Sequence, residues 1–115
     1  MFDDTCVFCK IIQGKIPSTV IMQNEHVLVI KDIHPKAPIH YLILPKNHVT
    51  NIASLTDLDR ELCWQILSTA RDLSIKVCNG AGFNLLFNNG ADAGQSVFHL
   101  HAHFLSGKNI FDNNL

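Results

Sequence analysis

The chain has 115 residues, of which 47% are hydrophobic and 17% are charged, the balance expected of a single globular domain spanning residues 1–115. Nine Lys and Arg residues stand against ten Asp and Glu residues, so the formal net charge is −1. There is no basic excess to drive binding to nucleic acid or an anionic membrane, whereas a nucleotide-sized ligand needs only local donors.

The N-terminal segment is acidic at Asp3 and Asp4, where a secretory signal would be basic. No apolar run reaches the ~18–20 residues needed to span a bilayer. We therefore expect a cytoplasmic protein that is not membrane-bound. In that compartment the four cysteines should stay reduced.

The first half of the chain predicts one brief helix followed by three strands. A short apolar stretch before Gly14 is typical of a helix, and two prolines disfavour a helix in the loop 32–38. The predicted elements are a helix at 7–13 and strands at 19–23, 26–31 and 39–44.

The second half predicts one long helix and two further strands. Thr56, with Asp59 three residues later, has the pattern of a capping box at a helix start. Apolar residues then recur every three or four positions, and the chain turns at Asn79 and Gly80. The predicted stripe is Leu58, Leu62, Ile66, Ala70, Leu73 and Val77, and the predicted strands are 83–88 and 97–105.

This order of elements predicts an α+β domain. Its sheet is expected to be five-stranded and antiparallel, with the long helix on one face and the short N-terminal helix as a further element. A sheet of this size leaves edges that favour cover or pairing, so a homodimer is expected.

Three histidines in five residues alternate with apolar residues near the end of the chain. In an extended strand residues two apart share a face, so His99, His101 and His103 should form a column spaced at ~6.5–7 Å. A column of imidazoles costs desolvation energy unless ligands or partners satisfy the rings, which favours a functional site. The alternate residues are predicted to face the core: Phe98, Leu100, Ala102 and Phe104.

The middle ring, His101, is the candidate nucleophile or base. A neutral imidazole can attack phosphorus through one nitrogen while an acceptor holds the other protonated. His103, on the same face, could protonate a departing group or hold phosphate oxygens. Two alternatives stay open on the triplet alone: ordinary half-buried histidines, or a hydrolytic zinc held by the histidines.

The segment before the triplet favours phosphate chemistry. Residues 88–96 form a polar, glycine-containing loop that leads directly into the histidine strand. Such a loop can present backbone N–H groups and a hydroxyl to phosphate oxygens. A plain turn has the same composition, but beside three histidines we interpret the loop as an anion cradle.

A separate metal site is predicted near the N-terminus. Cys6 and Cys9 have the C-x₂-C spacing with which two thiolates bind one zinc ion. Zinc needs two further ligands, and His48 and His99 are the candidates. Such a structural site would tie the N-terminal segment to the sheet; the alternative is two unpaired thiols.

Three further residues are ambiguous when taken singly. Asp32, at the end of the second predicted strand, could accept hydrogen bonds from ribose hydroxyls, although an exposed loop carboxylate is the commoner interpretation. His40 and Asn88 allow similar alternatives.

Taken together, these segments resemble the histidine triad family. The stretch from Gly94 to Leu105 contains the pattern His-φ-His-φ-His-φ-φ, where φ is apolar, which is the signature of that family. The likeness extends, in the right order, over residues 9–12, 31–38, 40–48 and 88–94.

The resemblance implies a homodimer with a continuous sheet and a two-step hydrolysis. His101 would attack the α-phosphate of a purine nucleoside phosphoramidate or related ester, and water would release the monophosphate from the nucleotidyl-histidine. The carbonyl of His99 would orient His101, and His103 with Ser96 would assist the leaving group. In the loop that contains Gln95, Asn88 and Gly94 would hold phosphate oxygens. Asp32 and Ile33 would contact the ribose and the base. His40 would support the hydrogen-bond network of the active site.

Family members with this C-x₂-C pair bind zinc through positions matching Cys6, Cys9, His48 and His99, and the chemistry itself needs no cofactor. The Gly94-Gln95-Ser96 loop and residues 32–38 favour the purine nucleoside phosphoramidase branch over the dinucleoside polyphosphate hydrolase branch. A nucleotide-binding sensor or adaptor without turnover is the alternative from a different functional class.

Overall fold

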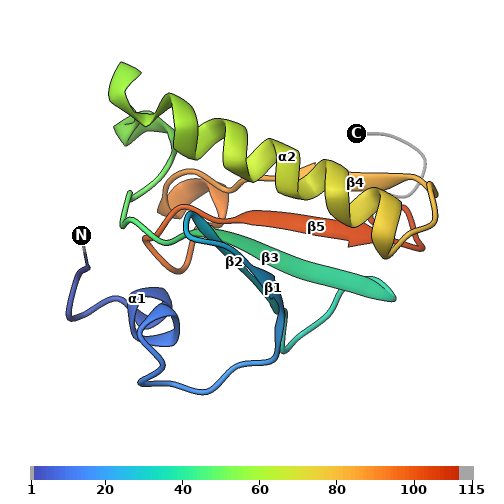
Figure 1. Ribbon diagram of the computed structural model, residues 1–115, viewed down its shortest axis with the longest axis horizontal. Helices are drawn as coiled ribbons and strands as arrows, with labels where there is room; N and C mark the ends of the chain where they lie inside the picture. The colour runs from blue at the N-terminus through green and yellow to red at the C-terminus, as the bar shows by residue number, and fades with distance from the viewer. Residues whose placement is uncertain (1, 112–115) are drawn as a thin grey trace.

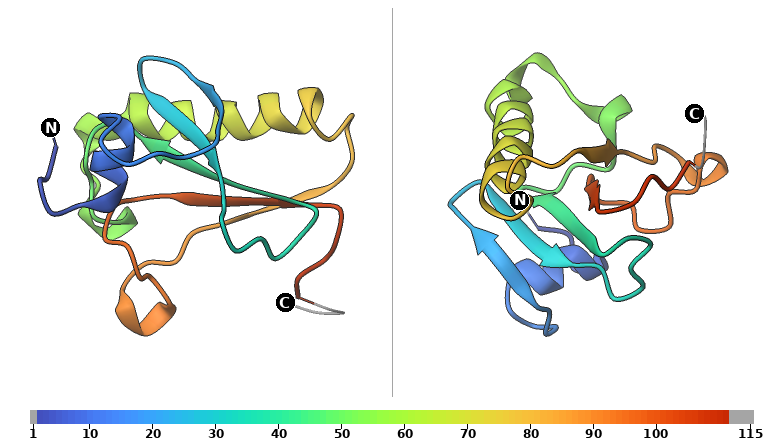
Figure 2. Two further views of the ribbon diagram at one scale, coloured as in Figure 1. Left: turned by 90° about the horizontal axis from the view of Figure 1, so that it is seen from below. Right: turned by 90° about the vertical axis from the view of Figure 1, so that its right-hand side faces the viewer.

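The computed structural model describes residues 2–111, in which five strands form one antiparallel sheet of order β1-β2-β3-β5-β4. A long helix, α2, lies across one face of the sheet, and a short helix, α1, lies on the other side (Figures 1 and 2). This confirms the predicted α+β fold. The bounds are α1 Val7–Ile12, β1 Val20–Gln23, β2 Val27–Lys31, β3 Ile39–Pro45, α2 Arg60–Lys76, β4 Phe83–Leu86 and β5 Ala102–Ser106.

The main core lies between α2 and the sheet. Alternate residues of the central strands face the helix, because successive side chains of a strand point to opposite faces. Each such side chain contributes about 1.5–3 kcal/mol when fully buried, so this layer fixes the sheet against α2. Its most buried members include Val27, Val29, Ile43, Ile66, Leu73, Ala102 and Phe104.

Among the described residues, no helix is long and apolar enough to cross a membrane.

The predicted capping box forms, but it lies one turn before the helix. The Thr56 hydroxyl accepts a hydrogen bond from the N–H of Leu58, and the Asp59 carboxylate accepts one from the N–H of Thr56. These bonds cap a 3₁₀ turn at Asp57–Asp59, and α2 begins at Arg60. Leu58 is 95% exposed, so its predicted place in the apolar stripe is wrong; the turn directs it away from the core.

The last strand is shorter than predicted. The expected strand 97–105 begins only at Ala102, because the ladder with β3 ends there. Pro45, further along β3, has no N–H to extend the ladder, and its carbonyl oxygen instead accepts a hydrogen bond from His99 Nε2 at 2.8 Å. A side chain thus takes the acceptor that a longer strand would have used. Strand β4 likewise ends at Leu86 rather than residue 88.

The predicted alternation of faces is confirmed for three of the four apolar residues around the histidines. Phe98 is 49% exposed, which contradicts its predicted core position, because it precedes the regular strand. The three that pack in the α2-side core are Leu100, Ala102 and Phe104.

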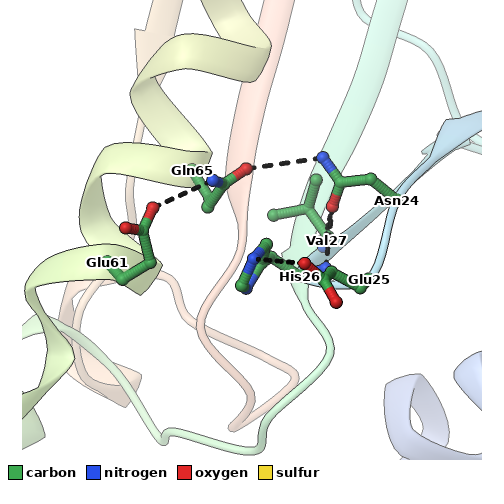
Figure 3. Close-up of polar contacts among 6 residues, drawn as sticks. All are labelled: Asn24, Glu25, His26, Val27, Glu61 and Gln65. Carbon is green, nitrogen blue, oxygen red and sulfur yellow. Dashed lines mark hydrogen bonds and ion pairs between the residues drawn. The ribbon is translucent and has the colours of Figure 1, made fainter.

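A polar bridge joins the turn between β1 and β2 to α2 (Figure 3). Asn24 donates to the side-chain oxygen of Gln65 at 3.4 Å, and Gln65 donates in turn to Glu61 at 2.9 Å. Within the turn, His26 Nε2 lies 3.3 Å from Glu25 Oε1. The bridge holds the edge hairpin against the start of the helix.

Candidate metal centre and active site

Four predicted metal ligands come together where α1 meets the segment before β5. Cys6 caps the N-terminus of α1, Cys9 lies within it, His48 follows β3, and His99 precedes β5. The Nδ1 atom of His99 lies 3.3 Å from Cys6 Sγ and 3.6 Å from Cys9 Sγ. His48 Nδ1 lies 3.4 Å from Cys9 Sγ and 3.1 Å from His99 Nδ1. The structure therefore assembles side chains that are up to 93 residues apart.

These distances fit a tetrahedral divalent cation. Zinc at about 2.3 Å from sulfur and about 2.0–2.1 Å from nitrogen requires S–N edges of about 3.5 Å and N–N edges of about 3.3 Å. The observed edges agree to within a few tenths of an ångström. The four ligand atoms all lie within 4.8 Å of one another. The donor set and its spacing are compatible with a closed, four-ligand zinc site.

The protonation states of these four side chains also favour binding of a cation. His99 Nε2 donates to the carbonyl of Pro45, so the lone pair of its neutral ring is on Nδ1, facing the sulfurs. Burial lowers the pKa of His99 to about 4, which keeps the ring neutral at pH 7. Burial raises the pKa of the Cys6 thiol, and a bound cation would offset that cost of forming the thiolate.

A second cluster, formed by Asp32, His40 and His103, lies on the sheet face that α2 does not cover. His40 Nε2 lies 2.9 Å from His103 Nδ1 and 3.3 Å from Asp32 Oδ2. The main-chain N–H of Lys36 donates to His40 Nδ1 at 3.0 Å. Burial lowers the pKa of His40, and it lowers the pKa of His103 to about 4, so both rings are neutral at pH 7.

His101 lies between the two groups of residues. Its Nδ1 donates to the carbonyl oxygen of His99 at 2.7 Å, so the lone pair is on Nε2. The ring of Phe8 packs edge-on against it at 5.0 Å, and the His103 ring lies 5.1 Å away. Burial lowers the pKa of His101, which favours the neutral ring with an unprotonated Nε2.

A cleft of about 350 Å³ opens beside His103. It brings together predicted residues from three regions of the chain, namely Asp32, His40, Asn88 and His103. Sequence reasoning missed its other walls, since an isolated lysine or leucine carries no motif. Those walls are Lys36, Leu86, Leu105 and Ile110.

The predicted phosphate loop is a braced turn. Gly90 and Gly94 adopt φ values of +96° and +92°, which favour glycine. The Asn88 side chain donates to the carbonyl of Ala93 at 3.0 Å, and a Cβ on Gly94 would lie 3.5 Å from that amide. The buried Gln95 amide donates to two main-chain carbonyls and accepts from the N–H of Gly90. Its side chain is therefore committed to holding the loop's shape.

Five predicted site residues do not line the cleft, namely Ile33, Gly94, Gln95, Ser96 and His101. Ser96 is exposed and lines a separate groove with Asp3 and Thr5, next to His48. Ile33 is 84% exposed on the loop after β2. The cleft thus contains four of the nine expected residues, and His101 is buried outside its lining, with its ring 5.1 Å from that of His103.

Comparisons with known proteins agree with this arrangement. Residues 5–113 match the family model described as "Scavenger mRNA decapping enzyme C-term binding". An uncharacterized HIT-like protein from Synechocystis is 38% identical over 108 residues, covering 94% of each chain.

Two solved structures extend the likeness to three dimensions. A HIT family hydrolase from Legionella pneumophila is 42% identical with a TM-score of 0.86, covering 90% of this chain and 94% of that one. A histidine triad nucleotide-binding protein from Candida albicans is 33% identical with a TM-score of 0.81, covering 90% and 76%.

Proposed function

This chain belongs to the histidine triad (HIT) family, and from that premise we propose that it is a nucleotide-binding hydrolase. Its proposed substrate is a purine nucleoside 5′-phosphoramidate or a related nucleotidyl ester. The observation that carries the proposal is the orientation of His101, whose Nδ1 proton is held by the His99 carbonyl while Nε2 keeps its lone pair. The names of similar proteins, a hydrolase and a nucleotide-binding protein, support the same class.

The reaction would proceed in two displacements at phosphorus. His101 Nε2 forms a bond to the α-phosphorus while the bond from phosphorus to the leaving nitrogen or oxygen breaks. Water then attacks the nucleotidyl-histidine, and the bond between phosphorus and His101 breaks. One water molecule is consumed overall: its oxygen ends on the monophosphate, and one of its protons compensates the proton gained by the leaving group.

The other predicted site residues would bind and orient the nucleotide. Asn88 and the backbone around Gly94 would contact phosphate oxygens, with Gln95 bracing the loop. Asp32 and the exposed side chain of Ile33 would contact the ribose and the base. Ser96 would reach the leaving group only after the loop shifts, because its side chain lies outside the cleft.

The metal centre would have a structural role. Cys6, Cys9, His48 and His99 would hold zinc, which ties α1 to the segment carrying the triad. The zinc would sit in a closed site with four protein ligands, so no open position is offered to substrate. Its contribution to hydrolysis is therefore to fix His99, whose carbonyl orients His101.

A homodimer is part of the proposal. β4 is an edge strand of the sheet, and α2 exposes large apolar side chains at Trp64, Leu67 and Ile75. The spacing of these residues places them on one helical face, which would be buried if a second copy packed there. Light scattering of the purified protein should give the mass of two chains, and Trp64→Glu should shift it toward one.

The test of the enzymatic proposal is a substrate panel followed by chemical trapping. Purified protein should hydrolyse adenosine 5′-phosphoramidate faster than diadenosine polyphosphates, and a rapid quench should capture a nucleotidyl group on the peptide containing His101. Tight binding of a monophosphate with no hydrolysis of any substrate would instead favour the sensor, and preferred cleavage of the polyphosphates would favour the other enzymatic branch.

A further inference from the structure

The cluster of Asp32, His40 and His103 has the ligand spacing of a metal site but a proton arrangement unlike one. Its three potential ligand atoms lie within 4.8 Å of one another, as in a two-histidine, one-carboxylate site. Spacing alone therefore does not distinguish a cation site from a hydrogen-bond chain. The position of each proton does, because a cation needs a lone pair on each coordinating nitrogen.

The proton arrangement is set at Lys36. Its main-chain N–H points at His40 Nδ1, 3.0 Å away, and an N–H group can only donate. The Nδ1 atom of His40 must therefore hold a lone pair. A neutral imidazole has one proton, so in His40 that proton is on Nε2, the nitrogen that faces the cluster.

The same reasoning then determines which ring nitrogen of His103 bears the proton. The Nε2 proton of His40 lies between His103 Nδ1 at 2.9 Å and Asp32 Oδ2 at 3.3 Å, and both can accept it. A proton on His103 Nδ1 would collide with it, so the single proton of His103 is on Nε2. The other oxygen of Asp32 accepts the main-chain N–H of His34 at 2.8 Å, which orients the carboxylate.

Burial supports the neutral state on which this reasoning depends. Desolvation lowers the pKa of His40 and His103, although the Asp32 carboxylate opposes that effect on each ring. The Lys36 charge acts in the same direction as burial on both rings. At pH 7 each ring therefore has one proton and one lone pair.

We propose that the main-chain N–H of Lys36 is a positioning group that sets the tautomers of His40 and His103. One consequence is that His103 directs a donor, Nε2–H, to substrate rather than a lone pair; this part rests on the proposed function. The other consequence is independent of it. Because His40 presents a proton to the cluster, a divalent cation cannot coordinate there unless the bond from Lys36 breaks.

The test compares two substitutions at one position. Lys36→Pro removes the N–H, whereas Lys36→Ala removes the ammonium group but keeps the N–H and serves as the matched control. Each zinc-saturated protein is titrated with Co²⁺, followed by visible absorption. Cobalt that exchanges into the cysteine centre is recognised separately by its thiolate charge-transfer bands.

We expect Lys36→Pro to bind one additional Co²⁺ at least about tenfold more tightly than Lys36→Ala, since outer hydrogen bonds to ligating histidines typically change metal affinity 10–100-fold. Equal cobalt binding by the two variants would overturn the proposal. If the parent protein hydrolyses none of the substrates, the proposed function is refuted. The comparison of cobalt binding between the two variants would still test the tautomer proposal.

A measurement on the parent protein decides the matter if Lys36→Pro fails to fold. In ¹⁵N-histidine-labelled protein, two-bond ¹H–¹⁵N correlations distinguish protonated from unprotonated ring nitrogens. His40 and His103 should both be protonated on Nε2, with His40→Gln and His103→Gln used to assign the signals. A proton on Nδ1 of either ring would overturn the proposal.

Discussion

The candidate metal centre and the cluster beside the cleft each contain a buried histidine that hydrogen-bonds to the main chain, His99 and His40 respectively. The two differ in whether the main-chain partner is an acceptor or a donor. In the cysteine centre the Pro45 carbonyl accepts from His99, so a lone pair faces inward. In the cluster beside the cleft the Lys36 N–H donates to His40, so a proton faces inward. Both rings are buried, and burial lowers both pKa values. The main-chain partner, rather than burial, therefore sets whether a lone pair or a proton faces the cluster.

His101 lies where the two clusters meet, and its removal should have the largest effect. We expect His101→Ala to lower kcat/KM for adenosine 5′-phosphoramidate by at least about a thousandfold, because removing a nucleophile eliminates the covalent pathway. Steady-state kinetics measure this. Metal content and the circular dichroism spectrum should match the parent, since the ring contributes no ligand to the cysteine centre. Near-normal turnover would contradict the mechanism.

Removing one cysteine of the candidate metal centre should affect stability more than catalysis. Cys6→Ala should abolish tight zinc binding and lower Tm by roughly 10 °C, the shift expected for a loss of about 2–3 kcal/mol in a domain of this size. Catalysis should fall less than stability at temperatures where the variant stays folded. Cys63→Ser is the control, because Cys63 is a partly buried cysteine outside both clusters. A fully stable, zinc-free and inactive variant would contradict a structural role.

Acid should destabilise the cleft cluster over a defined pH range. The pKa of His103 is about 4 in the folded protein against an ordinary value of 6.5, so between these values the unfolded chain binds a proton that the folded chain does not. Its contribution is present above pH 6.5 and is lost as the pH falls toward 4.

Thermal unfolding between pH 7.5 and 5 checks this expectation. Tm should fall with pH in the parent, and it should fall less steeply in His103→Gln. His34→Gln, at an exposed histidine outside both clusters, is the matched substitution for comparison. An unchanged slope in His103→Gln would show that another group carries the pH dependence.

The smallest effect is expected at Phe8, whose aromatic ring packs beside His99 and His101. The Phe8 ring lies 5.9 Å from His99 and 5.0 Å from His101. Phe8→Leu keeps an apolar side chain there and should destabilise the protein by about 1–2 kcal/mol. Zinc content should not change, and kcat/KM should fall less than tenfold. A loss of zinc from this variant would show that the Phe8 ring holds the metal ligands in place.

Local patterns predicted the fold class and pointed to residues that gather in the two clusters. Strict alternation around the triad placed Leu100 and Phe104 on the core side, and the C-x₂-C spacing identified the two thiols. These predictions succeed because periodicity and short spacings are properties of adjacent residues. The strand start at Ala102 was missed, because it depends on Pro45, more than fifty residues earlier.

The finer features of the site depend on main-chain groups that have no sequence signature. Nothing in the identity of Lys36 indicates that its N–H meets His40 Nδ1. Likewise, Ser96 belongs to the predicted loop, but its side chain lines a groove with Asp3 and Thr5 rather than the cleft beside His103. Such features are set by the three-dimensional arrangement of several segments, so sequence reasoning can suggest the residues but not their protons or directions.

The stereochemical course at phosphorus tests the covalent role of His101 most directly. A nucleoside phosphoramidate made chiral by sulfur at the α-phosphorus is hydrolysed in ¹⁸O-labelled water, and the configuration of the resulting thiophosphate is determined. Each in-line displacement inverts the configuration, so attack by His101 followed by attack of water predicts net retention. Net inversion would mean that water attacks the substrate directly, and it would contradict the account.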